Sequence, residues 1–359
     1  MKRFFKILLI ILLCFVLLVG AYFAYVFLAY KRIDDMQELG VTAPETAGSD
    51  EVAAGEPLKI VSYNVGFGAY SADYDFFMDG GTQSWAFSKE AVYTNIAGAV
   101  NEIKTADPDF LYVQEVDIDG TRSYHVDERE LIVPELPGYY YTFAQNYDSP
   151  FLFYPFNQPH GANKAGIMTF SKYEITSALR RSLPIENTVM KLVDLDRCYS
   201  VNRVPTENGK ELVLYNMHLS AYTSDGTIAN EQLKMLCEDM SAEYAKGNYC
   251  IAGGDFNKDL LGDSGSIFGV AKSENDTWAQ PIPDGIIPEE FVLVAPFDES
   301  NPVASCRTAS EPYNINTTFR ITIDGFLISS NVELIKSDVI DAGFAWSDHN
   351  PVYMEFKLN

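Results

Sequence analysis

Residues 251–257 read IAGGDFN, an apolar run that ends in two glycines, an aspartate and an asparagine. Polar residues follow other apolar, β-type runs in the same way. Six such clusters carry, in chain order, Asn64, Glu115, His218, Asp255 with Asn257, Asp324, and Asp348 with His349. The body of a strand is buried while its end is exposed, so strand ends are natural places for functional carboxylates, amides and imidazoles. One such residue means little, because Asp and Asn are common turn formers. Together the clusters predict an active-site rim with the donor groups of a divalent-metal phosphoesterase.

The order and wording of these motifs resemble the endonuclease/exonuclease/phosphatase superfamily from about Leu58 to the C-terminus. The likeness rests on GGDFN at 253–257 and SDHNPV at 347–352. This superfamily includes DNase I-type nucleases, neutral sphingomyelinases and inositol polyphosphate 5-phosphatases. The resemblance implies an α/β fold of the DNase I-like type, in which two mixed β-sheets pack as a four-layer sandwich.

The hydrophobic pattern agrees with that fold. Apolar residues recur at helical spacing in 92–103 and again in 233–244, where Gly247 ends the second pattern. Each of these predicted helices precedes an apolar run that leads to a polar cluster. Further apolar runs at 321–329 and 351–358 predict late antiparallel strands.

The resemblance also implies a role for each candidate residue. It assigns binding of Mg²⁺ or Mn²⁺ to Asn64, Glu115 and Asp348, catalysis to His218, Asp255, Asn257, Asp324 and His349, and a phosphate contact to Arg197. A phosphodiester resists attack because its anionic oxygens repel a nucleophile. A catalyst must therefore neutralise charge, activate water and stabilise the leaving oxygen.

The general base is open between two candidates. Asp255 can deprotonate water itself, or His349 can do so with Asp324 on its other ring nitrogen, where a carboxylate fixes the tautomer and raises basicity. We favour Asp255 as the base that orients water and His349 as an acid/base that contacts phosphate. Asp255 and Asn257 are two residues apart, so on an extended segment they would face the same way.

The N-terminus carries a membrane-spanning pattern. Residues 7–30 are 24 residues without a charge, which gives about 36 Å of helix and is enough to span the hydrocarbon core. Basic residues without acids precede the run, so the catalytic part is expected outside. A cleaved signal peptide is the alternative, but no suitable cleavage site follows Val19. We therefore expect residues 1–33 to form the anchor of a single-pass cell-membrane protein whose catalytic domain is extracytoplasmic.

Two further parts follow the anchor. Residues 34–57 are acidic and small, which predicts a flexible stalk. Residues 58–359 are expected to form one catalytic domain, without internal repeats. The cysteines beyond the anchor lack zinc-type spacing, and we favour buried thiols over disulfides, which an oxidising compartment would permit but a domain of this size does not require: Cys198, Cys237, Cys250 and Cys306.

Charge and loop composition limit the substrate. The chain has 26 basic and 50 acidic side chains and a net charge of −24, which repels a long nucleic acid. Aromatic-rich loops at 66–88 and 139–160 either pack onto the domain or form an apolar rim for a lipid headgroup or a base. We expect a phosphodiester substrate and favour a phospholipid. An extracellular nuclease and a non-catalytic binding module are the alternatives, and no protein partner is inferred.

Overall fold

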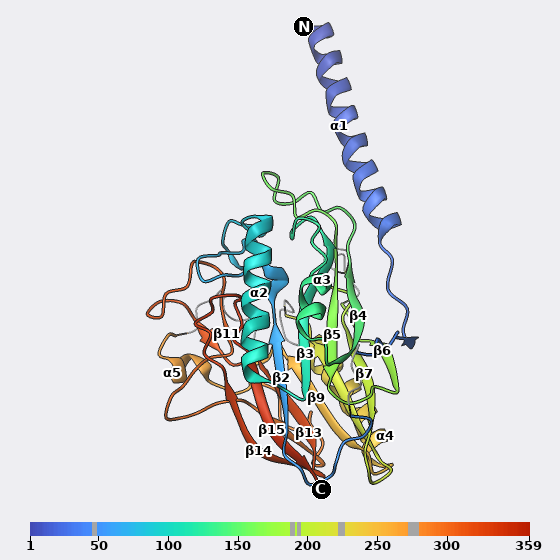
Figure 1. The fold of residues 1–359 in the computed structure, drawn as a ribbon. Coiled ribbons are helices and arrows are strands. Elements are labelled where there is room, and N and C mark those ends of the chain that lie inside the picture. Colours follow the sequence, from blue (N-terminus) through green and yellow to red (C-terminus); the bar gives the residue numbers. More distant parts are fainter. Residues whose placement is uncertain (45–48, 187–190, 192–194, 222–226, 272–279) are drawn as a thin grey trace.

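The computed structural model describes residues 1–44, 49–186, 191, 195–221, 227–271 and 280–359. Two mixed β-sheets face each other and carry helices on their outer sides, which confirms the predicted sandwich (Figure 1). Within the described residues, one sheet has seven strands in the order β1-β6-β7-β8-β9-β13-β10. The other has six strands in the order β14-β15-β2-β3-β5-β4, and β11 and β12 form a separate pair.

The strands of the seven-stranded sheet are β1 Gln37–Glu38, β6 Ser177–Ser182, β7 Cys198–Pro205, β8 Glu211–His218, β9 Tyr249–Asp255, β13 Asp324–Ser329 and β10 Phe291–Val294. Those of the six-stranded sheet are β14 Val332–Val339, β15 Val352–Leu358, β2 Leu58–Asn64, β3 Phe110–Gly120, β5 Asn163–Ser171 and β4 Tyr140–Asp148. The short pair is β11 Cys306–Arg307 and β12 Arg320–Ile321. The α-helices are α1 Lys2–Ala29, α2 Lys89–Ala106, α3 Arg129–Ile132, α4 Thr227–Tyr244 and α5 Ser264–Phe268. Short 3₁₀ turns are η1 Gly66–Gly68, η2 Phe77–Asp79 and η3 Val133–Glu135.

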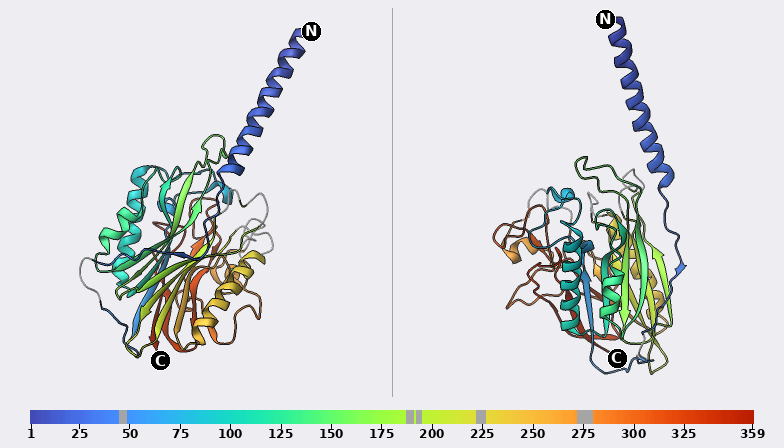
Figure 2. Two further views of the ribbon diagram at one scale, coloured as in Figure 1. Left: turned by 90° about the vertical axis from the view of Figure 1, so that its right-hand side faces the viewer. Right: turned by 45° about the horizontal axis from the view of Figure 1, so that its top comes forward.

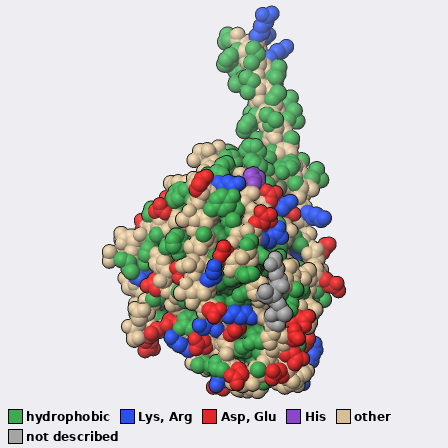
Figure 3. Space-filling view, in the orientation of Figure 1, with side chains coloured by type: hydrophobic (Ala, Val, Ile, Leu, Met, Phe, Trp, Pro, Cys, Tyr) green, Lys and Arg blue, Asp and Glu red, His purple; other side chains and the backbone are tan. Residues whose placement is uncertain are grey.

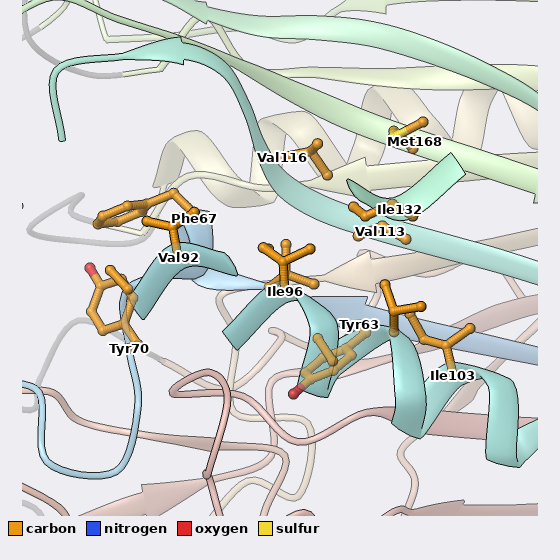
Figure 4. Close-up of a cluster of buried hydrophobic side chains, with 14 of the residues drawn as sticks. Tyr63, Phe67, Tyr70, Val92, Ile96, Ile103, Val113, Val116, Ile132 and Met168 are labelled. Carbon is orange, nitrogen blue, oxygen red and sulfur yellow. The ribbon is translucent and has the colours of Figure 1, made fainter. Parts of the chain in front are cut away.

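The two helices predicted from hydrophobic spacing are confirmed as α2 and α4, which lie on opposite outer sides of the sandwich (Figure 2). Figure 4 shows the face of α2 that carries Val92, Ile96 and Ile103 packed toward β3. The Oγ of Ser88 begins α2 by accepting from the amide of Ala91, which satisfies a donor that the first helical turn leaves free. Separate cores lie under α2, between the sheets and under α4. These three apolar layers account for the four-layer packing.

Strand direction explains how distant motifs meet. β2 with β3, and β8 with β9, are parallel pairs, so their C-terminal ends share one edge of the sandwich. The expectation that every cluster ends a strand is corrected for Glu115, which lies inside β3, and for two clusters that precede or begin a strand. Asp324 begins β13, and His349 lies ahead of β15. Because β13 and β15 run antiparallel to β9 and β2, their beginnings reach the same edge.

The described part of residues 34–57 differs from the expected flexible stalk. β1 extends the seven-stranded sheet by pairing with β6, Thr42 forms a bridge with Tyr141, and Val52 is fully buried. Composition misses this packing because a strand joins a sheet edge through its backbone and needs few apolar side chains.

Helix α1 projects away from the domain (Figure 1). Its length and apolar composition are enough to cross a membrane, and its position near the N-terminus also fits a signal sequence. The four cysteines beyond it are buried and free, which confirms the expected thiols.

Gly98 makes room for the segment that carries the last polar cluster. A Cβ at Gly98 in α2 would lie 2.2 Å from Cδ2 of Trp346, and Trp346 precedes Asp348 and His349 by only two and three residues. Gly98→Ala is therefore expected to destabilise the fold by about 1–3 kcal/mol through overpacking, although alanine usually favours a helix. Urea unfolding measures the change.

The control for this variant is Asn101→Ala, at an exposed position of the same helix. We expect it to be neutral or slightly stabilising, because only helix propensity changes there. Equal stability of both variants would contradict the packing assigned to Trp346.

Candidate active site

Asp255 lies at the centre of the converging side chains. Its Oδ2 is 3.5 Å from Nε2 of His218, 3.7 Å from Nε2 of His349 and 3.2 Å from Nδ2 of Asn64. The sheet sets this arrangement, because His218 and Asp324 are the cross-strand neighbours of Asp255 on β8 and β13. Five predicted residues are thus brought to one point from both sheets.

His349 and Asp324 form a buried pair. The ring Nδ1 of His349 is 2.8 Å from Oδ2 of Asp324, and the same oxygen accepts from the Oγ of Ser305 at 2.7 Å. Burial alone lowers the pKa of His349, but the Asp324 carboxylate outweighs it and holds the pKa well above its usual value. His349 is therefore an imidazolium at neutral pH, and its Nε2 side faces Asp255 and the Sγ of Cys306.

The other two central groups are shifted in different directions. Burial is the main cause that raises the pKa of Asp255 to about 7, with Asp324 and Glu115 adding to it and His349 opposing it. Burial and then the charge of Arg197 lower the pKa of His218, so its ring is neutral. A carboxylate near its titration point thus lies between a charged and a neutral imidazole.

Glu115 departs from the expected strand end. It lies inside β3, in a bulge between Val113 and Val116, with a φ of 57°. A bulge breaks the alternation of side chains and re-aims the residue that it contains. The Oε1 of Glu115 consequently accepts from Nδ2 of Asn64 at 3.2 Å.

The oxygen donors fit a hard divalent cation. Glu115 and Asp348 both line the cavity, and burial first, with the charge of Glu115 also contributing, raises the pKa of Asp348 to about 6. Crowded carboxylates of this kind suit Mg²⁺ or Mn²⁺. Asn64 turns its Nδ2 toward the carboxylates, because its Oδ1 accepts from the amide of Gly66 at 3.0 Å.

Asn257 corrects the expectation of an extended GDFN segment. β9 ends at Asp255, and Asn257 has a left-handed φ of 49°. Its amide nitrogen donates to Oδ1 of Asp255 at 2.8 Å, and its Nδ2 donates to the carbonyl of Leu219. Asn257 still lines the cavity, through a turn rather than through strand alternation.

The converging side chains enclose a cavity of about 140 Å³. All the predicted site residues line it except Asn64 and Asp324, which lie behind Glu115, Asp255 and His349 and hold them by hydrogen bonds. Arg197 lines the wall and is buried.

Two lining arginines were missed from the sequence. Arg122 makes a two-point bond to Asp117 at 2.7 and 3.1 Å and stacks over the ring of Phe67. Arg307 donates to the carbonyl of Ser71 at 2.9 Å. Both are buried beneath the loop 66–88, so nothing in their local sequence separates them from surface arginines.

Three comparisons place the chain among known proteins. Residues 61–349 match the model of the Endonuclease/Exonuclease/phosphatase family. No curated protein matches the sequence. An endonuclease/exonuclease/phosphatase from Beutenbergia cavernae is similar in structure, with a TM-score of 0.58, 16% identity and coverage of 84% of this chain and 72% of that one.

Two further solved structures share the fold. The 2′,3′-cyclic phosphatase ANGEL2, in complex with adenosine-2′,3′-vanadate, gives a TM-score of 0.55 at 17% identity and covers 90% of this chain and 99% of its own. The human Nocturnin catalytic domain with bound sulfate gives 0.52 at 16%, with 89% and 97% covered.

The charged His349 can donate a proton or a hydrogen bond to the phosphate. His349→Gln should therefore lower kcat by roughly 10²–10⁴-fold, the usual scale for lost proton transfer. Asp324→Asn should lower it less, and the double variant should be no slower than His349→Gln, because Asp324 acts through the imidazole. The measurement is steady-state hydrolysis of bis(p-nitrophenyl) phosphate.

His125 provides a matched control, because it also pairs with an aspartate, Asp119 at 2.7 Å, but on the exposed surface. His125→Gln should leave kcat unchanged. Additive losses from Asp324→Asn and His349→Gln would contradict a single His–Asp unit.

Proposed function

The chain belongs to the endonuclease/exonuclease/phosphatase family, and from this premise we propose that it is a metal-dependent phosphodiesterase, anchored in the cell membrane, that cleaves a lipid headgroup outside the cytoplasm. One observation carries the catalytic part of this proposal. Asp255 is within 3.7 Å of both His218 and His349, in a cavity whose wall also holds Glu115 and Asp348.

The protonation states of these residues suggest a different catalytic role for each of them. A general base is most effective when its pKa is near the working pH, and the pKa of Asp255, raised to about 7, meets this condition. Asp255 therefore takes the proton of the attacking water. His349, charged through Asp324, donates to a phosphate oxygen, and neutral His218 donates from the other side of Asp255. This assignment favours Asp255 over the His349–Asp324 pair as the base.

Glu115 and Asp348 would hold the cation, with Asn64 beside them. When bound, a divalent cation supplies Lewis-acid stabilisation of the charge on the phosphate. Asn64 would have to exchange its bond with Gly66 to offer its oxygen. Otherwise it fixes the orientation of Glu115 and Asp255 as a hydrogen-bond donor.

The position of the cavity and the charge of the chain support a lipid substrate. His160 lines the cavity and belongs to the loop whose residue Phe151 is hydrogen-bonded to Tyr22 of α1. A net charge of −24 disfavours polyanions. The likeness to ANGEL2 concerns the fold alone, so nucleotide phosphodiesters are tested as the competing substrates.

Chelation with EDTA should abolish hydrolysis, and Mg²⁺ or Mn²⁺ should restore it without any change in circular dichroism. Hydrolysis of phosphatidylcholine or sphingomyelin vesicles should exceed that of DNA or a cyclic nucleotide at 0.15 M salt. Full activity in EDTA would contradict the proposed metal dependence. Efficient DNA cleavage without lipid turnover would contradict the proposed lipid substrate but would still agree with phosphodiesterase activity.

Topology can be tested by labelling introduced cysteines, because the four native thiols beyond α1 are buried and should react little with the label. A membrane-impermeant maleimide added to intact cells should label Glu333→Cys on the exposed face of β14. It should label Lys2→Cys only after permeabilisation. The reverse pattern would place the domain in the cytoplasm, and a mature protein without residue 2 would identify a cleaved signal sequence.

A further inference from the structure

An uncharged aromatic loop stands out on this acidic protein. Residues 149–163 contain no Asp, Glu, Lys or Arg. Phe153, Tyr154 and Phe156 within it are 52%, 64% and 83% exposed. The other aromatic loop, 66–88, is mostly buried: Phe67 and Tyr74 are fully buried, and its exposed ring is Phe87 at 44%. The rings of Tyr154 and Phe156 also contact each other at 5.9 Å, and a contiguous exposed apolar patch is typical of an interaction surface.

The loop is hydrogen-bonded to the C-terminal part of α1. The Oη of Tyr22 donates to the carbonyl of Phe151 at 3.1 Å and accepts from the amide of Phe153 at 3.2 Å. The Oη of Tyr25 accepts from the amide of Phe151 at 3.1 Å. The rings of Tyr22 and Phe153 also meet edge to face at 5.2 Å. In Figure 3, hydrophobic side chains continue from α1 onto the domain at this junction.

The length of α1 sets the level of this junction in a bilayer. Nineteen residues separate Lys6, the last basic residue before the uncharged run, from Tyr25, which is about 28 Å along a helix, close to the roughly 30 Å of a hydrocarbon core. With the N-terminal basic residues at one interface, Tyr22 and Tyr25 reach the other, where tyrosines are enriched. The loop hydrogen-bonded to them lies at that same level.

The base of the loop is part of the cavity wall. Tyr154 contacts Phe77 with ring centroids 5.9 Å apart, and Phe77 contacts His160 at 5.6 Å. His160 lines the cavity, and its Nδ1 is 3.1 Å from the carbonyl of Ser84. The wall of the cavity at His160 is thus connected to the loop by a chain of packed rings.

We propose that residues 151–156 are a second membrane contact, which lies in the headgroup region of the outer leaflet beside α1 and holds the mouth of the cavity against the bilayer. Its partner is a zwitterionic lipid surface. The loop supplies apolar area without cations, and the acidic domain would be repelled by an anionic leaflet. This inference rests on the proposed membrane anchor and places the headgroups next to the loop whose His160 lines the same cavity as Asp255.

Fluorescence of the full chain in phosphatidylcholine vesicles tests the contact without requiring turnover. Phe156→Trp should add emission that is blue-shifted and is quenched by about half by lipids brominated on the upper acyl chain, since an interfacial indole reaches that depth. The matched control is Leu334→Trp, 41% exposed on β14 at the end of the domain away from α1 (Figure 1). Its added emission should not respond to bromine. Equal quenching of both variants, or of neither, overturns the proposal.

Activity provides the second readout. The pair Phe153→Ser with Phe156→Ser should lower vesicle hydrolysis several-fold and leave bis(p-nitrophenyl) phosphate turnover unchanged. The control pair is Leu334→Ser with Ile335→Ser, also exposed, which should change neither rate. Equal vesicle rates for the two pairs overturn the role in substrate access. If the wild-type chain hydrolyses no phosphoester at all, the proposed function fails, and the quenching result alone decides the membrane contact.

Discussion

The amide of Asn64 joins the two sheets at the site, because its Nδ2 bonds Glu115 of one sheet and Asp255 of the other, each at 3.2 Å. Buried polar bonds just beneath it fix the sheets against each other. Gln114 of the six-stranded sheet donates to Asn216 of the seven-stranded sheet at 2.8 Å. Asn216 in turn donates to the carbonyl of Met168 on the six-stranded sheet at 2.7 Å. A buried amide that loses its partner costs about 1–3 kcal/mol, so these bonds resist any sliding of the sheets. The distances around Asp255 therefore depend on contacts that are not themselves catalytic.

This packing also determines the charges of the site. Burial favours the neutral form of each isolated group, which is why the pKa of His218 falls and that of Asp255 rises. For His349 the effect of burial is outweighed, chiefly because the Asp324 carboxylate lies 2.8 Å from its ring and raises its pKa. Two imidazoles on either side of one carboxylate thus acquire opposite protonation states, His218 through burial and His349 through its pairing with Asp324. Pairs of groups separated in this way are the usual sign of acid and base assignments.

The sequence predicts elements better than it predicts local backbone. The buried faces of α2 and α4, and the strand ends at Asn64, His218 and Asp255, follow from periodicity and apolar runs. The bulge at Glu115 leaves no such pattern, because two polar residues after the apolar run 110–113 look the same in sequence whether the strand ends there or continues through a bulge. Arg122 was missed for another reason. Its burial depends on Phe67, 55 residues earlier in the chain, and local composition carries no information about such a contact.

The junction between anchor and domain limits where the site can act. Arg32 donates to the carbonyl of Leu183 at 2.6 Å, and the amide of Ser182 donates to Asp35 at 2.7 Å. Arg180 donates to the carbonyl of Asp34 at 3.0 Å. A flexible linker would let the domain sample a volume that grows with linker length, whereas these bonds hold the first residues after α1 against β6. With the proposed anchor in a bilayer, the height of Asp255 above the membrane is thus set by the fold. A site held at a fixed height samples less of the surrounding solution, but it is exposed to a high local concentration of headgroups in the adjacent leaflet.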